Sequence, residues 1–435
     1  MFKKIYAPLN MQWEVIPTCN YNCHHCYNHW RRSNEGVINS LWALENGSKV
    51  VDEIIQNKVN ALTITGGEPL LVFDEIKPYI NKLVDNGVKV SINTNAAYLD
   101  NGIAHYLGTQ NIGILVSLPC CIPEINDRIT DTTGSFFATT TGCKTALKHG
   151  VRVSINMVVS KINQNHVIET ARFVKDTFGL TGFMATKAGK PINATEEYDQ
   201  YEVGLPDFRK LMEDLLYIRH EFGMTIDSLT AYPECAYVTE ESFRLIGAKR
   251  KCTAGRTIAS IGFDGSVRAC TRAQQSYGNL AEDTLIECWD RMSDWRSDDF
   301  LPEKCKECDR RDGCAGGCRT EASAISSLMN ADDPCMDASN LPVRFKYSKC
   351  EISEFSDRDI FLLIEDFQTM NEEFGIRITV NSQSVFITAE LFAFIDTHRG
   401  RSFTKADLKS YFNIDDSLAN QLLTFLNGRG LSTLI

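Results

Sequence analysis

Three cysteines near the start of the chain have the spacing of ligands for an iron–sulfur cluster. Cys19, Cys23 and Cys26 follow directly after the first predicted strand. Three thiolates can bind three irons of a [4Fe–4S] cluster and leave the fourth iron open for chemistry. A structural zinc site is the alternative, in which His24 or His25 would complete the four ligands that zinc prefers. The spacing by itself leaves both kinds of site open.

A second motif, Thr-Gly-Gly-Glu-Pro, ends the next predicted strand at Thr65. Gly66 and Gly67 let the backbone approach a ligand closely, and Glu68 offers a carboxylate to an ammonium group. A glycine pair alone is common in loops. Here it follows the cysteine loop at the carboxyl end of the neighbouring strand, where barrel enzymes build their active sites.

Together the two motifs resemble the signature of the radical S-adenosylmethionine (SAM) superfamily. The resemblance implies that SAM binds the open iron through its amino and carboxylate groups, and that its methionine part lies against Gly66, Gly67, Glu68 and Pro69. Further SAM contacts are expected at the ends of the third and fourth predicted strands, at Thr94, Asn95 and Ser117. Polar strand caps are the alternative interpretation of these three residues. The chain departs from the family after Ser117, where Pro119 and Cys120 replace a frequent Asp-Gly pair.

The mechanism that this resemblance implies is the cofactor's, and the protein mainly positions and shields it. A reduced cluster passes an electron to SAM, and the resulting 5′-deoxyadenosyl radical removes a hydrogen atom from the substrate. The electron would come from a reducing protein such as a flavodoxin or ferredoxin. A covered barrel mouth is expected, because water and oxygen would react with the cluster and the radical.

A later segment contains seven more cysteines at regular spacing. A zinc ribbon would explain four of them but would leave Cys252, Cys270 and Cys335 unassigned. The whole set resembles the SPASM extension of radical SAM enzymes, which binds two auxiliary [4Fe–4S] clusters. By the family pattern, Cys252, Cys270 and Cys318 would bind the first auxiliary cluster, and the second would be bound by Cys305, Cys308, Cys314 and Cys335.

The first auxiliary cluster would then have three protein ligands and the second four. Some relatives supply the missing ligand from a cysteine shortly after the first one, where this chain has Thr257 and Ile258. The first auxiliary cluster is therefore expected either to be open to substrate or solvent, or to be closed by a distant thiol. The candidates for that thiol are Cys235, Cys288 and Cys350, for which a buried, inert cysteine is the alternative.

Short β-rich segments alternate with helical ones between residues 11 and 186, which predicts successive βα units with parallel strands. The predicted strands are 11–16, 59–65, 88–93, 112–118, 151–159 and 181–186. The predicted helices include Ser40 to Gln56, Ile76 to Asp85, Ala138 to His149 and Pro206 to Glu221. The simplest closure is an α/β fold with a partial (β/α)6 barrel, similar to a TIM barrel.

Composition changes along the chain predict further modules. Residues 1–190 would form the radical SAM barrel, 191–250 a connector, 251–350 the SPASM domain and 351–435 a small winged-helix-like domain. In the SPASM segment we expect a hairpin around Asp264 and Gly265, and so little apolar core that metal must hold it together. In the last segment we expect a hairpin around Asn381 and Ser382 and then three helices.

The overall composition is that of a soluble globular protein, with 43% hydrophobic and 23% charged residues. No run of about 18 apolar residues predicts a membrane span. The first residues lack the apolar stretch of a secretory signal, so a cytoplasmic location is expected. The net charge of −11 argues against binding to duplex nucleic acid.

The resemblance also narrows the substrate, because SPASM enzymes largely modify peptides or proteins. One branch matures ribosomally made peptides, and another oxidises a Cys or Ser of sulfatases to formylglycine. The second branch commonly has an Asp directly after the cysteine that corresponds to Cys270, whereas this chain has Thr271, which lacks an obvious proton acceptor.

The last segment resembles winged-helix domains that recognise the leader of a precursor peptide, which they add as a strand to a sheet edge. The favoured function is therefore side-chain crosslinking of a precursor peptide, by carbon–carbon (cyclophane) or ether bonds. Thioether formation, formylglycine generation and a non-enzymatic iron–sulfur regulator that binds DNA are the alternatives.

Overall fold

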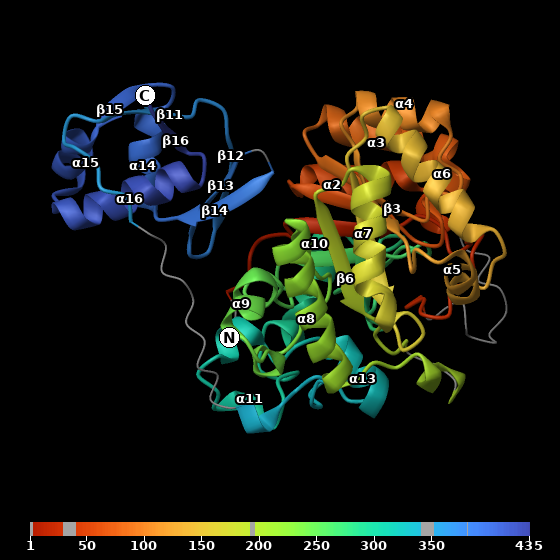
Figure 1. The fold of residues 1–435 in the computed structure, drawn as a ribbon. Helices are drawn as coiled ribbons and strands as arrows, with labels where there is room; N and C mark the ends of the chain where they lie inside the picture. Colours follow the sequence, from red (N-terminus) through yellow and green to blue (C-terminus); the bar gives the residue numbers. More distant parts are fainter. Residues whose placement is uncertain (1–2, 29–40, 192–195, 341–351, 381) are drawn as a thin grey trace. The chain divides into compact units, whose positions relative to one another are not determined.

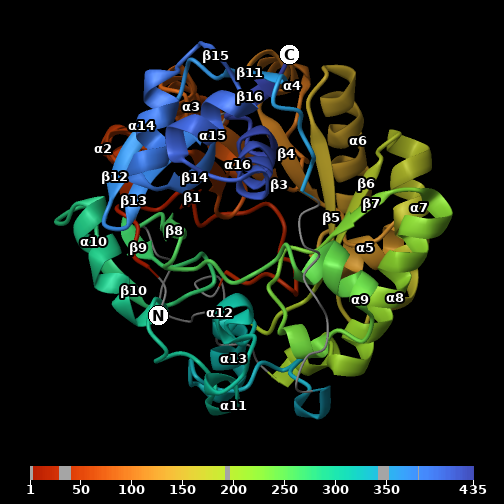
Figure 2. The same ribbon diagram turned by 90° about the vertical axis from the view of Figure 1, so that its left-hand side faces the viewer.

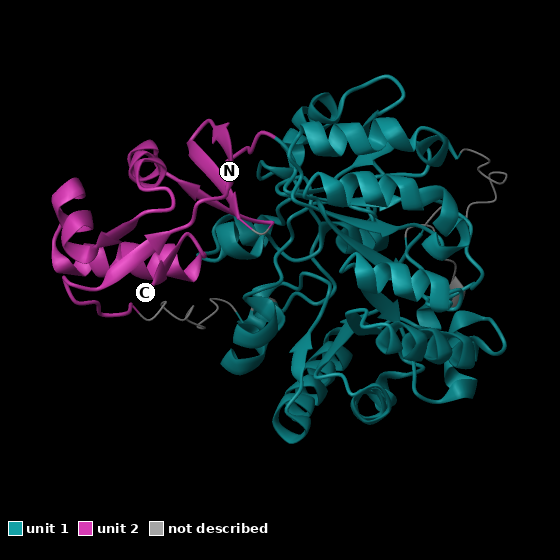
Figure 3. Cartoon of the chain, turned by 90° about the horizontal axis from the view of Figure 1, so that it is seen from above, with its two compact units in different colours: residues 1–2, 7–347 teal, residues 3–6, 348–435 magenta. Residues whose placement is uncertain are grey.

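The computed structural model describes residues 3–28, 41–191, 196–340, 352–380 and 382–435. Its contacts divide the chain into two compact units (Figure 3). The first unit contains residues 1–2 and 7–347, and the second contains residues 3–6 and 348–435. The boundaries expected at 190 and 250 lie inside the first unit and stay predictions. No helix in the described parts of the chain is long and apolar enough to cross a membrane.

The first unit is built on a sheet that, within the described residues, has ten strands in the order β10-β9-β8-β1-β2-β3-β4-β5-β6-β7. Strands β1 to β7 run parallel to one another, and β8 is parallel to β1 on the opposite side from β2. The bounds of the strands are β1 Asn10–Glu14, β2 Ala61–Thr65, β3 Lys89–Thr94, β4 Gly113–Ser117, β5 Val153–Val159, β6 Gly182–Lys187, β7 Thr225–Asp227, β8 Ile258–Ile261, β9 Ser266–Arg268 and β10 Ser276–Asn279. The six predicted barrel strands and the parallel α/β fold are thereby confirmed.

Helices cover the outer side of this sheet, because each has one apolar face. The helices alternate with the strands along the chain, and Figure 1 and Figure 2 show α7 beside β6. Their bounds are α1 Trp42–Glu45, α2 Gly47–Gln56, α3 Phe73–Asp85, α4 Asn101–Thr109, α5 Pro123–Thr130, α6 Ser135–Lys148, α7 Val167–Phe178, α8 Leu205–Phe222 and α9 Glu240–Ser242. The prediction of a single helix from Ser40 to Gln56 is wrong in its first part. The chain forms α1 and α2, with a break at Asn46, and Ser40 itself lies outside the described residues.

The cysteine-rich segment corrects a second expectation, because it has an apolar core of its own. Its predicted hairpin forms as β8 and β9, and β8 joins the barrel sheet beside β1. The side chains of Val267, Leu285, Trp289 and Trp295 are buried. Helices α10 Leu285–Arg291, α11 Glu303–Lys306, α12 Arg311–Cys314 and α13 Arg319–Ser326 complete this part. Packing against the sheet therefore supports the segment together with any metal.

The described residues of the second unit form two small sheets, β15-β11-β16 and β12-β13-β14, and three helices. Its own core includes Phe361, Phe394, Leu423 and Leu426, each fully buried. The bounds are β11 Ile360–Leu363, β12 Gln368–Glu372, β13 Gly375–Val380, β14 Gln383–Ile387, α14 Ala389–Thr397, β15 Ser402–Thr404, α15 Lys405–Phe412, α16 Asp416–Gly428 and β16 Ser432–Leu434. The predicted hairpin strands and three helices are confirmed, whereas Asn381 in the turn lies outside the described residues. The winged-helix assignment stays a prediction.

Candidate active site at the carboxyl end of the barrel

The predicted cysteine loop and the Gly-Gly-Glu-Pro loop are tied together by backbone hydrogen bonds. The amide of Gly67 donates to the carbonyl of Ile16 at 2.5 Å, and the amide of Glu68 donates to the carbonyl of Thr18 at 2.9 Å. At the other end of the cysteine loop, Asn28 Nδ2 donates to the carbonyl of Gly66 at 2.8 Å. The loop that carries the three cysteines is therefore fixed at both ends by the motif on the next strand.

Glycine is required in this second motif because of the close backbone approach. Gly66 has a φ of +134°, and a Cβ atom there would lie 2.5 Å from the carbonyl oxygen of Ile16. A Cβ atom on Gly67 would overlap the carbonyl of Thr18. The two glycines therefore allow the cysteine loop to pack closely against this motif. From the sequence alone, we expected them only to allow close approach of a ligand.

Glu68 lies at the centre of a buried hydrogen-bond network, with only 1% of its surface exposed. Its carboxylate accepts hydrogen bonds from the hydroxyl of Thr94 at 2.6 Å, the amide of Asn95 at 2.8 Å and the amide of Leu70 at 3.0 Å. Burial raises the pKa of Glu68, and the donors from Asn95, Thr94 and Leu70 lower it again in part. Thr94 and Asn95, predicted to contact SAM, thus also hold the carboxylate in place.

A cavity of about 310 Å³ opens beside these groups. All three cysteines of the first motif line it, as do Gly66, Gly67, Glu68, Thr94, Asn95 and Ser117. The sulfur of Cys19 accepts the Tyr21 amide at 3.4 Å and lies 3.9 Å from Asn95 Nδ2. Three thiols and one buried carboxylate facing a single cavity fit a [4Fe–4S] cluster with a SAM-sized ligand beside it. His24, which a zinc site could have used as its fourth ligand, stacks on the ring of Tyr201 with 5.0 Å between the ring centroids.

The same cavity is lined by residues that the sequence analysis missed. They include Gln12, Asn156, Lys187 and Arg272. Lys187 is the last residue of β6, and the carboxyl end of a barrel strand is the position that could have identified it. Arg272 follows β9, outside the βα repeat, and no local pattern places it at the barrel mouth.

Three downstream cysteines expected at the first auxiliary cluster lie close together. The pKa of Cys270 is raised to about 12, chiefly by burial and in part by the thiolates of Cys318 and Cys252. Burial also raises the pKa of Cys318, and the charge of the Cys252 thiolate adds to this rise. Buried thiols that repel one another become thiolates when a metal offsets their charge, so this set fits a cluster.

The second group of cysteines contains a thiol that was not assigned to it. Cys305 and Cys314 have pKa values raised to about 11 and about 12, chiefly by burial and in part by Cys235. Burial raises the pKa of Cys335 as well, and Cys235 again contributes. Cys235 therefore lies with the second group, which argues against its closing the first cluster.

The two other candidate thiols do not change this assignment. The charged neighbours that affect the pKa of Cys288 include Asp283 and Arg291 but none of the cluster cysteines, and burial is the main cause of its rise to about 12. Cys350 lies outside the described residues. Among the described residues, no three His, Cys, Asp or Glu side chains come close enough to share a single metal ion.

Comparison with known proteins agrees with this arrangement. Residues 13–174 match the Radical SAM superfamily, and residues 252–309 match the iron–sulfur cluster-binding SPASM domain. The chain is 24% identical to the AdoMet-dependent heme synthase of Methanosarcina barkeri over 75% of this chain and 96% of that protein. It is 25% identical to the mycofactocin maturase MftC of Mycobacterium tuberculosis over 77% of this chain and 85% of that protein.

The fold is also that of a solved structure, Streptococcus suis SuiB bound to its precursor peptide SuiA. The TM-score is 0.59 at 18% identity, and the match covers 75% of each chain. The matched domains, the cysteine loop and its buried glutamate lead to one conclusion. This chain carries a domain of the radical SAM superfamily at residues 13–174 and an iron–sulfur cluster-binding SPASM domain at residues 252–309.

Proposed function

We propose that this protein is a maturase that crosslinks side chains of a ribosomally made precursor peptide. Similarity supports a peptide substrate through the mycofactocin maturase and the SuiB–SuiA complex. Similarity to the heme synthase is nearly equal, so sequence identity alone does not decide the substrate.

The observation that carries the proposal is the second unit. The heme synthase and the mycofactocin maturase cover similar shares of this chain, 75% and 77%, so coverage does not distinguish them. Residues 348–435 form a separate compact unit with its own core. A small module with sheets of its own suits recognition of an extended peptide, which binds by adding a strand to a sheet edge.

The cavity also bears on the type of reaction. Thr271, directly after Cys270, lines the cavity with its hydroxyl 3.4 Å from Gln12 Oε1. Among the described residues that line the cavity, Glu68 has the only carboxylate, and three hydrogen bonds hold it. A carboxylate base free to accept a substrate proton is therefore missing from this described lining, which weighs against formylglycine formation.

The residues of the site have separable roles in this proposal. Cys19, Cys23 and Cys26 would hold the SAM-binding cluster, and the network around Glu68 would orient the SAM amino group. When bound, SAM and this cluster supply the 5′-deoxyadenosyl radical that removes hydrogen from the substrate. Two auxiliary clusters in the SPASM domain and a flavodoxin or ferredoxin as electron donor complete the proposal.

Coexpression with short peptides encoded beside the gene tests the function. We expect mass spectrometry to find paired losses of hydrogen, and fragmentation to locate the two joined residues. The matched control is Cys23→Ala, which should leave the peptide unchanged. If the wild-type protein cleaves SAM but returns every such peptide unmodified, the proposal is wrong. A crosslink that consumes a cysteine thiol, detected by loss of alkylation, would favour the thioether alternative.

Leader recognition by the second unit has its own test. Phe386 on β14 is 36% exposed and lies 5.4 Å from the ring of Phe374. We expect Phe386→Ser to weaken binding of a fluorescent leader peptide to the full chain. Tyr217→Ser, at a residue of the first unit that is 44% exposed, is the control. Equal leader affinity in both variants would remove this face from the recognition site.

A further inference from the structure

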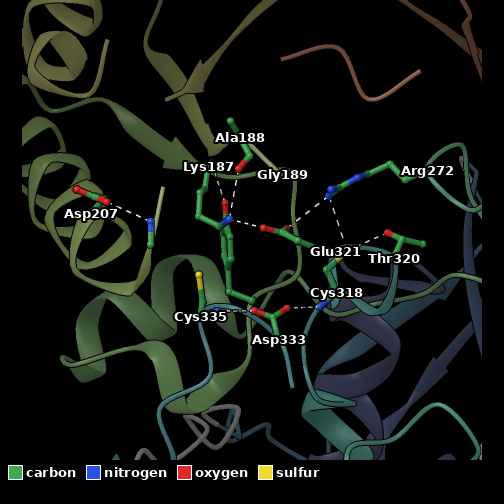
Figure 4. Close-up of polar contacts among 12 residues, drawn as sticks. Lys187, Ala188, Gly189, Asp207, Arg272, Cys318, Thr320, Glu321, Asp333 and Cys335 are labelled. Carbon is green, nitrogen blue, oxygen red and sulfur yellow. Dashed lines mark hydrogen bonds and ion pairs between the residues drawn. The ribbon is translucent and has the colours of Figure 1, made fainter. Parts of the chain in front are cut away.

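A buried ion network connects the end of the barrel with the SPASM domain (Figure 4). Lys187 at the end of β6 pairs with Glu321 of α13, and both side chains are 2% exposed. Arg272 Nη1 lies 3.6 Å from the other oxygen of the same carboxylate. Glu321 therefore holds two cations that come from different parts of the chain.

Arg272 also contacts a predicted ligand of the first auxiliary cluster. Its Nη1 donates to the sulfur of Cys318 at 3.7 Å, and the hydroxyl of Thr320 lies 3.2 Å from the same sulfur (Figure 4). An arginine guanidinium stays protonated in proteins, so a positive hydrogen-bond donor lies beside this predicted cluster ligand.

The position of the guanidinium depends on the absence of a side chain at Gly189. A Cβ atom there would overlap Arg272 Nη2 and lie 2.8 Å from its Cζ. Gly189, Lys187 and Arg272 all line the cavity that the cysteine loop opens onto. One guanidinium therefore lies between that cavity and the sulfur of Cys318.

We propose that Arg272 is a positioning residue that raises the reduction potential of the first auxiliary cluster through its hydrogen bond to Cys318. A positive donor at a cluster sulfur stabilises the reduced form, which carries more negative charge. Lys187 and Glu321 keep the guanidinium in place, and Gly189 leaves room for it. This proposal rests on Cys318 being a cluster ligand and is independent of the substrate.

The test measures a potential in the complete protein, with all clusters reconstituted without oxygen. A redox titration followed by electron paramagnetic resonance gives the midpoint of each cluster. The signal that is lost in Cys318→Ala and does not respond to SAM belongs to the first auxiliary cluster. In Arg272→Gln we expect its midpoint to shift to a more negative value, and in Arg272→Lys to recover in part.

Gly189→Ala should push the Arg272 guanidinium away from Cys318 without removing its charge or its hydrogen-bond donors. The far end of a flexible arginine can move, so the chain should still fold and bind its irons, with a midpoint shifted in the same direction. Arg291→Gln is the control, because Arg291 pairs with Asp283 at 2.7 Å elsewhere in the SPASM segment.

Two outcomes would overturn the proposal. Unchanged midpoints in Arg272→Gln and Gly189→Ala at full iron content would show that Arg272 does not affect the cluster. Loss of four irons per chain from both variants would make Arg272 a structural residue instead.

Discussion

The hydroxyl of Thr94 donates a hydrogen bond to Glu68 at 2.6 Å and so joins the last residue of β3 to the loop after β2. Glu68 belongs to the motif that fixes the cysteine loop through Ile16 and Thr18. The carboxylate is consequently oriented by the neighbouring strand, while its own loop orients the cluster ligands. The predicted cluster ligands and the predicted SAM contacts are thus joined by one connected set of hydrogen bonds.

Glu68→Gln should weaken SAM binding more than it changes the fold. A charged hydrogen bond contributes about 1.5–3 kcal/mol, so we expect affinity for SAM to fall roughly tenfold to a hundredfold. Equilibrium dialysis with labelled SAM measures this directly. Thr94→Val should cause a smaller loss, because the amides of Asn95 and Leu70 still hold the carboxylate.

The control for these variants is Thr63→Val on β2. The hydroxyl of Thr63 lies 3.1 Å from the hydroxyl of Ser91. Thr63 is not among the described residues that line the cavity. If all three variants bound SAM equally well, Glu68 would have no part in the SAM site.

Gly67→Ala should remove the SAM-binding cluster. The added Cβ would overlap the carbonyl of Thr18, so the cysteine loop must move away from the second motif. We expect iron content to fall by about four of about twelve irons per chain after reconstitution. Gly102→Ala is the matched control, since a Cβ there would lie 3.4 Å from its nearest neighbour, Asp100 Oδ1. Full iron content in Gly67→Ala would contradict this account of the loop.

Iron content should also separate the downstream cysteines into two groups. Cys270→Ala should lose the first auxiliary cluster, and Cys314→Ala the second, about four irons each. Cys288→Ala should keep all three clusters, since the charged groups that affect its thiol do not include a cluster cysteine. Mössbauer spectroscopy distinguishes a lost cluster from a damaged one. A loss of the same cluster in Cys270→Ala and Cys314→Ala would contradict the grouping.

Breaking the buried pair of Lys187 and Glu321 should destabilise the first unit. Lys187→Met leaves the carboxylate with Arg272 alone at 3.6 Å, and removing one partner of a buried ion pair costs about 3–5 kcal/mol. Urea unfolding followed by tryptophan fluorescence measures the change. Lys82→Met, in an exposed pair with Asp52, should change the free energy of unfolding by less than about 1 kcal/mol. Similar losses in both variants would show that burial of the pair has no special weight.

The parallel barrel, the cysteine loop, the motif around Glu68 and the two hairpins could be predicted from the amino-acid sequence. These features depend on contacts between residues that are near in the sequence or on strands that follow one another. The periodicity of apolar residues and the spacing of the motif residues therefore predict them. The break between α1 and α2 was missed because a helical pattern runs through Asn46. The apolar core of the cysteine-rich segment was missed because its strand β8 packs beside β1, which is far away in the sequence.

The wall of the cavity formed by Lys187 and Arg272 could not be predicted from the sequence. Lys187 and Glu321 are 134 residues apart, and Arg272 reaches Cys318 from 46 residues away. No spacing rule connects such residues, because their meeting depends on how the SPASM segment folds back onto the end of β6. The sequence therefore supplied the groups that bind the cofactors, and the fold decided which charges lie beside them.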